Sequence, residues 1–453
     1  MTSPFVILQS PRDTLAAANL QHEPPWFRIV PGEASLVYLV RGSQLFAVDP
    51  TIAAALSQGD REATNSLRAF SDTIPRALAP SEALPVWNAL SLNVAQSCNL
   101  ACDYCYADEG RFGGRSRMMQ PSVAIAAVSR FLNSACAGRV TVGFIGGEPF
   151  LNRAAMHAAV DCAIDIAQAR HLDLRFSVTT NGTLLTNDDI DFLRRNRFAV
   201  SVSVDGSERA NDAHRRARDG SGSFERIRKT IRPLLEDPRG CKVAARATLT
   251  RDDLDVLDRL DHLEAMGFAE VGVSPLRTSP TADLALQAED WPVLLSQMRR
   301  AGERERERVL SGLPLRFSNL HVAMVQIHRG HASPLPCGAG ANYLSANAEG
   351  EFYTCHRTID DGRFYLGNLQ SGPSTRTRAA FLSKRHVDHQ EPCRTCWARY
   401  LCGGGCHAEV IASGRQGCDY IRGWLEYCMQ FYHWALSHTL ITYAPHFLSE
   451  PRP

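Results

Sequence analysis

The chain has 453 residues, enough for about two to four domains. Its 49 Lys and Arg residues nearly balance 48 Asp and Glu residues, and the net charge of +1 disfavours binding to nucleic acid or to an anionic membrane. No basic region precedes the short apolar run at the N-terminus, and no stretch approaches the roughly 18 apolar residues that span a bilayer. We therefore expect a soluble, cytoplasmic protein.

Residues 1–85 are predicted to form a small α+β unit. The runs FRIV, SLVYLV and QLFAVD are typical of three short strands, TIAAALSQ is typical of a helix, and PRALAPSEALP is typical of a linker. Two roles remain open for this unit. It is either a peptide-recognition module, which adds a peptide as an extra strand to a sheet edge, or a subdomain that caps the next domain.

Residues 88–315 alternate between strand-like and helical patterns. Six βα units in succession predict a parallel sheet covered by helices, open or curved into a partial barrel. The predicted strands are LSLNVAQS, VTVGFIGG, DLRFSVTTNG, FAVSVSVDG, KVAARATLT and AEVGVSPL. The sixth helix ends in ERERERV, an alternating charge run that is typical of a solvated helix face.

Residues 316–440 are rich in cysteine and glycine. NYLSANAEGEFYTC predicts a β-hairpin that turns at Glu349 and Gly350, and YIRGWLEYCMQFYHWALSHTL predicts an amphipathic helix. Fourteen cysteines are many for a chain from a reducing compartment, so clustered cysteines indicate metal binding or catalysis. We expect this region to fold around metal as much as around an apolar core, with residues 441–453 as a tail.

Three cysteines, Cys98, Cys102 and Cys105, fall where the first strand of the βα series ends. Catalytic ligands collect at this end of the strands in such folds. Three thiolates hold a small iron–sulfur cluster but leave one of four irons open, and an open metal position is where substrate or cofactor binds. A structural zinc site is the alternative, and the lack of a nearby fourth ligand disfavours it.

Short polar and glycine motifs end the next three strands. They are IGGEP at 145–149, TTNG at 179–182 and SVDG at 203–206. Each motif alone is typical of a tight turn. Together they place polar side chains on the rim that carries the three cysteines.

CNLACDYC followed by IGGEP resembles the motifs of radical S-adenosylmethionine enzymes. The resemblance implies a 4Fe–4S cluster on the three cysteines, whose open iron chelates S-adenosylmethionine, and a 5′-deoxyadenosyl radical that abstracts a substrate hydrogen. It implies that Tyr104 lies near the adenine, that Glu148 accepts from the methionine ammonium, and that Arg246 contacts the cofactor carboxylate. The other cofactor-binding positions that it implies are Gly146, Gly147, Thr180, Asn181, Ser203 and Asp205.

The cysteines after residue 330 resemble those of the SPASM domain, which carries two auxiliary 4Fe–4S clusters. By this resemblance Cys337, Cys355 and Cys406 hold the first auxiliary cluster. The second would be held by Cys393, Cys396, Cys402 and Cys418. Tyr343 stands where a further cysteine is expected, so the first cluster either keeps an open iron or is completed by Cys428. Zinc is the competitor, because CRTC is also typical of a zinc knuckle, although the later intervals fit zinc poorly.

The expected fold is therefore α/β: a partial (β/α)6 radical SAM barrel between a small N-terminal α+β unit and a C-terminal cysteine-rich SPASM domain. The resemblance implies an enzyme that matures a precursor peptide or a small protein subunit, with a flavodoxin or ferredoxin as reductant. We favour thioether crosslinks from a cysteine sulfur to carbon, because YLCGGGC and the pair Cys418 and Cys428 resemble thioether-forming maturases.

Several alternatives remain open. One is a carbon–carbon crosslink, and another is formylglycine formation, in which relatives place an Asp directly after the cysteine at position 355. His356 stands there in this chain, and a neutral imidazole can also accept a proton, so it is the candidate catalytic base. From different classes come a non-catalytic iron–sulfur scaffold and a zinc-binding regulatory protein.

Overall fold

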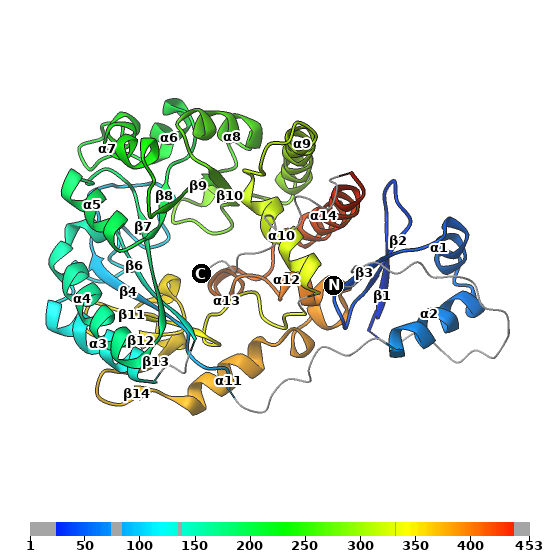
Figure 1. Cartoon of the computed structure of the whole chain (residues 1–453), viewed down its shortest axis with the longest axis horizontal. Helices are drawn as coiled ribbons and strands as arrows, with labels where there is room; N and C mark the ends of the chain where they lie inside the picture. Colours follow the sequence, from blue (N-terminus) through cyan, green and yellow to red (C-terminus); the bar gives the residue numbers. More distant parts are fainter. Residues whose placement is uncertain (1–23, 74–83, 135–137, 331, 439–453) are drawn as a thin grey trace.

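The computed structural model describes residues 24–73, 84–134, 138–330 and 332–438 (Figure 1). The predicted tail at 441–453 and most of the predicted linker lie outside the described residues. The sequence from residue 24 onwards begins with a three-stranded antiparallel sheet of β1 (Phe27–Val30), β2 (Leu36–Leu39) and β3 (Gln44–Ala47). Helices α1 (Pro50–Ser57) and α2 (Arg61–Thr73) follow. The three predicted strands and the first helix are confirmed, and α2 is an addition.

A second, larger sheet forms the centre of the molecule. Its first six parallel strands, in spatial order, are β4 (Ala89–Gln96), β6 (Arg139–Gly146), β7 (Asp173–Thr180), β8 (Ala199–Ser203), β9 (Lys242–Leu249) and β10 (Glu270–Pro275). The two-residue strand β5 (Arg117–Met118) pairs with β4 in antiparallel fashion. The predicted series of six parallel strands is confirmed.

Helices follow these strands in turn and cover one face of the sheet. They are α3 (Pro121–Ser134), α4 (Arg153–Arg170), α5 (Asn187–Arg195), α6 (Glu208–His214), α7 (Phe224–Glu236), α8 (Val256–Ala265) and α9 (Asp290–Leu310). The pattern of strand β7 shows why: Phe176 and Val178 join the apolar core, whereas Ser177 and Thr179 are half-buried. Since successive side chains of a strand point to opposite faces, the apolar residues meet the helices and the hydroxyls line the inner face.

The alternating charge run at the end of α9 was expected to be a solvated face, and this prediction was wrong in part. Glu305 is fully buried, and its carboxylate accepts a hydrogen bond from the backbone N–H of Arg316 at 2.8 Å. The neighbouring Arg304 and Arg308 pair with the carboxylate of Glu264, which is 8 % exposed. Arg304, Glu305 and Arg308 therefore connect α9 to α8 and to the segment after α9 by ion pairs and hydrogen bonds.

The central sheet continues into the cysteine-rich region. Strand β11 (Tyr343–Ala346) pairs in parallel with β4, so that Tyr343 lies beside Ala89. Strands β12 (Glu351–Tyr353), β13 (Tyr365–Asn368) and β14 (Gly372–Pro373) then extend the sheet in antiparallel fashion. The predicted hairpin is confirmed: the side chain of Asn347 accepts from the backbone N–H groups of Glu349 and Glu351 across the turn.

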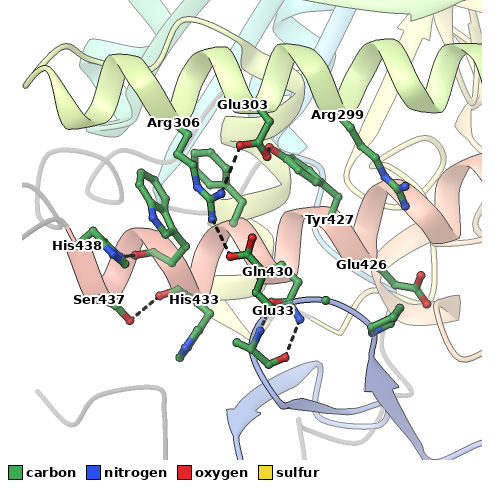
Figure 2. A pocket seen from close by; sticks show the side chains of 15 residues that line it. Glu33, Arg299, Glu303, Arg306, Glu426, Tyr427, Gln430, His433, Ser437 and His438 are labelled. Carbon is green, nitrogen blue, oxygen red and sulfur yellow. Dashed lines mark hydrogen bonds and ion pairs between the residues drawn. The ribbon is translucent and has the colours of Figure 1, made fainter.

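The remaining helices surround the cysteines. They are α10 (Ser318–Arg329), α11 (Thr375–Arg385), α12 (Arg399–Cys402), α13 (His407–Ser413) and α14 (Cys418–His438). Helix α14, which confirms the predicted amphipathic helix, packs on α9 and α10 and reaches strand β1 (Figure 1). A pocket of about 580 Å³ lies where α9, α14 and the turn between β1 and β2 meet (Figure 2). None of the helices in the described ranges combines the length and apolar character needed to cross a membrane.

Candidate active site

Cys98, Cys102 and Cys105 follow strand β4 and form what we call the first cysteine site. All three side chains are half-buried, and the thiol of Cys98 accepts from the N–H of Leu100 at 3.4 Å. Burial raises the pKa of Cys98 to about 12 and that of Cys102 to about 11, with the neighbouring thiols of the site adding to both. Three thiolates close together in a half-buried site are stable only beside cations, and the iron ions of a cluster would be such cations.

The two glycines that end strand β6 allow it to approach the loop that carries Cys98. The N–H of Gly147 donates to Ala95 O at 2.8 Å, and the N–H of Glu148 donates to Ser97 O at 2.9 Å. A Cβ atom on Gly147 would lie 2.2 Å from Ser97 O, and one on Gly146 would lie 2.4 Å from Ala95 O. Glycine is therefore required at both positions for the loop to pack here.

The carboxylate of Glu148 is fully buried between two strand ends. It accepts hydrogen bonds from Phe150 N at 3.1 Å, Thr180 Oγ1 at 2.8 Å and Asn181 N at 2.7 Å. Burial raises its pKa to about 7, and these three donors oppose that rise. Glu148 thus joins the end of β6 to the end of β7, while its expected contact with a methionine ammonium stays a prediction.

Asn181 continues this connection to the first cysteine site. Its Nδ2 lies 3.6 Å from Cys98 Sγ and donates to Asn99 Oδ1 at 3.0 Å. Asn99 in turn donates to Thr183 Oγ1 at 2.8 Å. Hydrogen bonds to a ligand sulfur orient it and change its electron density, so Asn181 is placed to tune a bound cluster. Sequence reasoning placed Asn181 at this rim and missed Asn99.

Tyr104 belongs to a buried group of three interacting side chains. Its hydroxyl donates to Asp205 Oδ2 and accepts from Arg215 Nη1 at 3.0 Å. The other oxygen of Asp205 accepts from Thr248 N at 2.8 Å. Arg215 is 7 % exposed, and its charge lowers the pKa of the Cys102 thiol against the effect of burial. Arg215 was not predicted, because nothing in its local sequence marks it as buried.

Ser203 and Arg246 are neighbours in the register of β8 and β9. Ser203 is half-buried on the inner face of the sheet. The guanidinium of Arg246 donates to Glu270 Oε1 at 3.0 Å and to Ser318 Oγ at 3.1 Å. The carboxylate that Arg246 contacts in this structure is therefore a protein carboxylate, and its predicted contact with a cofactor stays a prediction.

The cysteines of the C-terminal region fall into two groups. We call Cys337, Cys355 and Cys406 the three-cysteine group: burial, followed by the thiols of Cys337 and Cys406, raises the pKa of Cys355 to about 12. The four-cysteine group is Cys393, Cys396, Cys402 and Cys418. Burial raises the pKa of Cys402 and of Cys418, and the thiols of Cys393 and Cys396 add to both. The thiols within each set therefore influence one another, while their role as cluster ligands stays a prediction.

Cys428, which was expected to ligate metal, lies in neither group. It is fully buried in the apolar core, where burial alone raises the pKa of its thiol. The cause is the continuity of α14: Cys418 opens this helix, and ten residues of helix place Cys428 about 15 Å farther along its axis. The prediction for Cys428 was wrong, and the side chain is part of the core.

Tyr343 and His356 lie beside the three-cysteine group. The hydroxyl of Tyr343 is 2.8 Å from His356 Nδ1 and 2.6 Å from Ser91 Oγ. The same ring nitrogen of His356 is 3.9 Å from Cys355 Sγ. Burial lowers the pKa of His356 to about 4, so the imidazole is neutral near pH 7. Its predicted role as a catalytic base stays a prediction.

Tyr106 lies between the first cysteine site and the three-cysteine group. Burial raises the pKa of its hydroxyl, and the thiols of Cys105, Cys355 and Cys406 all contribute to this shift. The Arg357 guanidinium lies 4.7 Å from the centre of its ring and 3.7 Å from Cys406 Sγ. The residue nevertheless remains 43 % exposed, so part of it is accessible to solvent beside the two sites. Neither residue was predicted, although Tyr106 directly follows the last cysteine of the motif.

In the described ranges, no three His, Cys, Asp or Glu side chains converge closely enough to hold one metal ion. A cluster of four irons is larger than one ion and holds its thiolates farther apart. Thiols grouped in threes and fours, most of them half-buried, with glycines that leave space at the loop of Cys98, fit such clusters better than they fit zinc.

Residues 92–274 match the family model described as the Radical SAM superfamily. The chain is 27 % identical over 344 residues to the mycofactocin maturase MftC of Mycobacterium tuberculosis, which covers 72 % of this chain and 79 % of that protein. It is 24 % identical over 363 residues to a serine-type anaerobic sulfatase-maturating enzyme of Klebsiella aerogenes, covering 75 % of this chain and 84 % of that protein.

Solved structures share the fold. The enzyme anSMEcpe with bound AdoMet superimposes with a TM-score of 0.66 at 19 % identity, over 81 % of this chain and 98 % of that chain. SuiB of Streptococcus suis bound to S-adenosylmethionine superimposes with a TM-score of 0.56 at 13 % identity, over 86 % of this chain and 97 % of that chain. Residues 92–274 are therefore a radical SAM domain, and the protein is an enzyme that uses S-adenosylmethionine.

Proposed function

We propose that this enzyme matures a ribosomal peptide or a small protein subunit by closing crosslinks within it. The first cysteine site would hold the 4Fe–4S cluster that binds S-adenosylmethionine, and the two C-terminal groups would hold auxiliary clusters. When bound, the cluster and S-adenosylmethionine would supply the radical that removes a hydrogen atom from the substrate. The maturases among its relatives support a peptide or protein substrate, as does the SuiB structure with its precursor peptide SuiA.

The observation that carries the proposal is the position of Tyr106. It directly follows Cys105 of the first cysteine site, and Arg357, which lies against its ring, is 3.7 Å from Cys406 Sγ of the three-cysteine group. A peptide bound against Tyr106 would therefore lie near both sites. Arg357 is held in this position because its guanidinium also donates to Glu409 Oε1 at 2.7 Å.

Thioether formation is the crosslink that the three-cysteine group favours. Three thiols leave one iron of a four-iron cluster without a cysteine ligand. The chain has Tyr343 in place of the expected fourth cysteine, and the Tyr343 hydroxyl contacts His356 and Ser91. A substrate cysteine would lose its proton when it binds the open iron. Its sulfur would then bond to the carbon radical that hydrogen abstraction leaves, and the surplus electron would pass to the auxiliary clusters. The protein would hold the two partners of the new bond in one place.

Two other reactions are the alternatives. A carbon–carbon crosslink needs no open iron, so a substrate that loses hydrogens while every cysteine stays free would favour it. Formylglycine formation is favoured by the sulfatase-maturating relatives. The expected base position is taken by His356, whose Nδ1 already faces the Tyr343 hydroxyl. A non-catalytic scaffold is inconsistent with an S-adenosylmethionine-dependent enzyme.

The test is mass spectrometry of the peptide or small protein encoded beside this gene, after anaerobic co-expression and with or without thiol alkylation. Loss of two hydrogens per crosslink, with cysteines that no longer alkylate, is the expected result. The same loss with every cysteine alkylated would replace the thioether with a carbon–carbon or carbon–oxygen bond. An unchanged mass, with S-adenosylmethionine cleaved, would contradict this substrate.

The auxiliary role is tested separately by replacing Cys393 and Cys396 with alanine. Crosslinking should be lost while some S-adenosylmethionine cleavage remains, because the first cysteine site is intact. Cys162, which is half-buried on α4 far from the three sites in the sequence, supplies the matched cysteine-to-alanine control. Full crosslinking by the double variant would refute a role for the four-cysteine group.

A further inference from the structure

Helix α11 ends in an arginine that is almost fully buried. Arg385 is 4 % exposed, and its guanidinium donates to three acceptors, none of which is charged. These are His407 Nδ1 at 2.8 Å, Gln390 Oε1 at 2.6 Å and Gly405 O at 3.4 Å. A buried cation surrounded only by neutral groups is strongly unfavourable unless an anion lies near it.

A second guanidinium converges on the same acceptor. Arg415, which is half-buried, donates to Gln390 Oε1 and also to Glu391 O at 3.1 Å. Within the part of the chain that the structure describes, neither Arg385 nor Arg415 forms an ion pair with a carboxylate. Two guanidinium groups therefore donate to the same oxygen, Gln390 Oε1. Their mutual repulsion makes this arrangement still less favourable unless an anion lies nearby.

Cysteines of both C-terminal groups lie around this pair of arginines, and they become anionic when they ligate a cluster. Gly405 and His407, which accept from Arg385, flank Cys406 in the sequence. Gln390, which accepts from both arginines, lies near Cys393: its Nε2 and Cys393 Sγ are 3.3 Å and 3.7 Å from the Cβ position of Gly404. The thiols of Cys393, Cys406 and Cys337 oppose the lowering of the pKa of Arg385, and Arg415 lowers the pKa of Cys418 against the effect of burial. Arg385 thus lies beside both groups, and Arg415 lies on the side of the four-cysteine group.

We propose that Arg385 and Arg415 are a shared counter-charge for the two auxiliary iron–sulfur clusters and that they raise the reduction potentials of both. The inference rests on the proposed function, because it requires clusters at both groups. A cluster bound by thiolates is anionic, and each electron that it accepts adds negative charge. A buried cation nearby stabilises the reduced form more than the oxidised form.

The experiment is a potentiometric titration, followed by electron paramagnetic resonance, of the full chain after anaerobic reconstitution. Iron and sulfide are counted first. Arg385→Gln should shift both auxiliary clusters to lower potential and leave the cluster of the first cysteine site unchanged. Arg385→Lys, which keeps the charge, should stay closer to the wild type. Arg376→Gln, an exposed arginine on the same helix, is the matched control and should change none of the three.

Each other outcome is decisive. A wild-type chain without iron at the C-terminal groups would overturn the proposed function and this inference together. Auxiliary clusters that are present but keep their potentials in Arg385→Gln would overturn the inference alone. If Arg385→Gln loses iron, Arg415→Gln leaves Arg385 in place and must still lower the potential of the cluster in the four-cysteine group. An unchanged potential there would overturn the inference.

Discussion

Gly147 is a position at which even a methyl side chain would separate two parts of the site. Gly147→Ala places a methyl group 2.2 Å from Ser97 O and 2.9 Å from Cys98 Cβ, so the loop that carries Cys98 must move. We expect the reconstituted variant to lose about four irons per chain, the content of one cluster. Iron analysis measures this. Gly362→Ala, which meets no atom within 4 Å, should keep the wild-type iron content.

Glu148 makes the stability of the fold depend on pH. Its folded-state pKa of about 7 lies above the ordinary 4.5, so the protonated form favours folding. This contribution is complete below about pH 4.5 and is lost as the pH rises through about 7. We therefore expect the free energy of unfolding of the wild type, relative to Glu148→Gln, to fall between pH 5 and pH 7.5. Chemical denaturation at both pH values tests this, and a constant difference would contradict it.

The resemblance predicts a fourth cysteine of the three-cysteine group at position 343, where this chain has Tyr343, and this permits a test of the open iron. Tyr343→Cys supplies that thiol, so crosslinking should fall by at least about tenfold while S-adenosylmethionine cleavage continues, because a filled iron cannot bind a substrate sulfur. Tyr343→Phe removes only the hydroxyl that contacts His356 and should retain crosslinking. Equal crosslinking by Tyr343→Cys and the wild type would rule out substrate ligation.

Among the elements, α14 connects the N-terminal sheet to the rest of the molecule. Gln430 accepts from Ala34 N at 3.1 Å and donates to Ala34 O at 2.9 Å and Val30 O at 3.3 Å, around the turn between β1 and β2 (Figure 2). Gly32 lies so close to Gln430 that a Cβ atom there would be 2.5 Å from its side chain. The side chain of Gln430 thus forms the hydrogen bonds that backbone groups elsewhere in a sheet would form with this turn.

Replacing Gln430 with alanine should loosen the N-terminal sheet without unfolding the barrel. Half-buried backbone groups would lose their hydrogen-bond partners, at a cost of about 1 kcal/mol. Hydrogen exchange of β1 and β2 should become faster, while that of β4 and β6 stays unchanged. Ser437→Ala is the control, because Ser437 lines the same pocket but donates only to His433 O of its own helix.

The elements also show how far the sequence could predict this structure. The six parallel strands were predictable because each is a short apolar run that ends in a turn motif. Helix α2 was not predicted because most of its residues are polar and its apolar face is narrow. Only Leu67 of this helix is fully buried. Arg385 and Glu305 could not be predicted as buried, since a charged side chain normally indicates solvent and their hydrogen-bond partners lie outside their own helices.

For the whole molecule, the proposal predicts about 12 irons per chain, from three four-iron clusters. It also gives the N-terminal unit a role in holding the substrate, because β3 pairs only with β2 among the described strands and leaves an edge free. Deleting residues 1–80 should weaken binding of the precursor peptide at least about tenfold and spare S-adenosylmethionine cleavage. Unchanged affinity, measured by fluorescence anisotropy, would leave the unit as a cap.

The parallel pairing of β11 with β4 has a consequence for engineering. A barrel expressed without the C-terminal region would expose β4 as a bare strand edge, which invites pairing with a second chain. Chimaeras that join this barrel to another enzyme's C-terminal region would also need a matching strand at that seam. The two regions therefore form one folding unit, and substrate range is more readily altered at the N-terminal sheet, which shares no strand with the barrel.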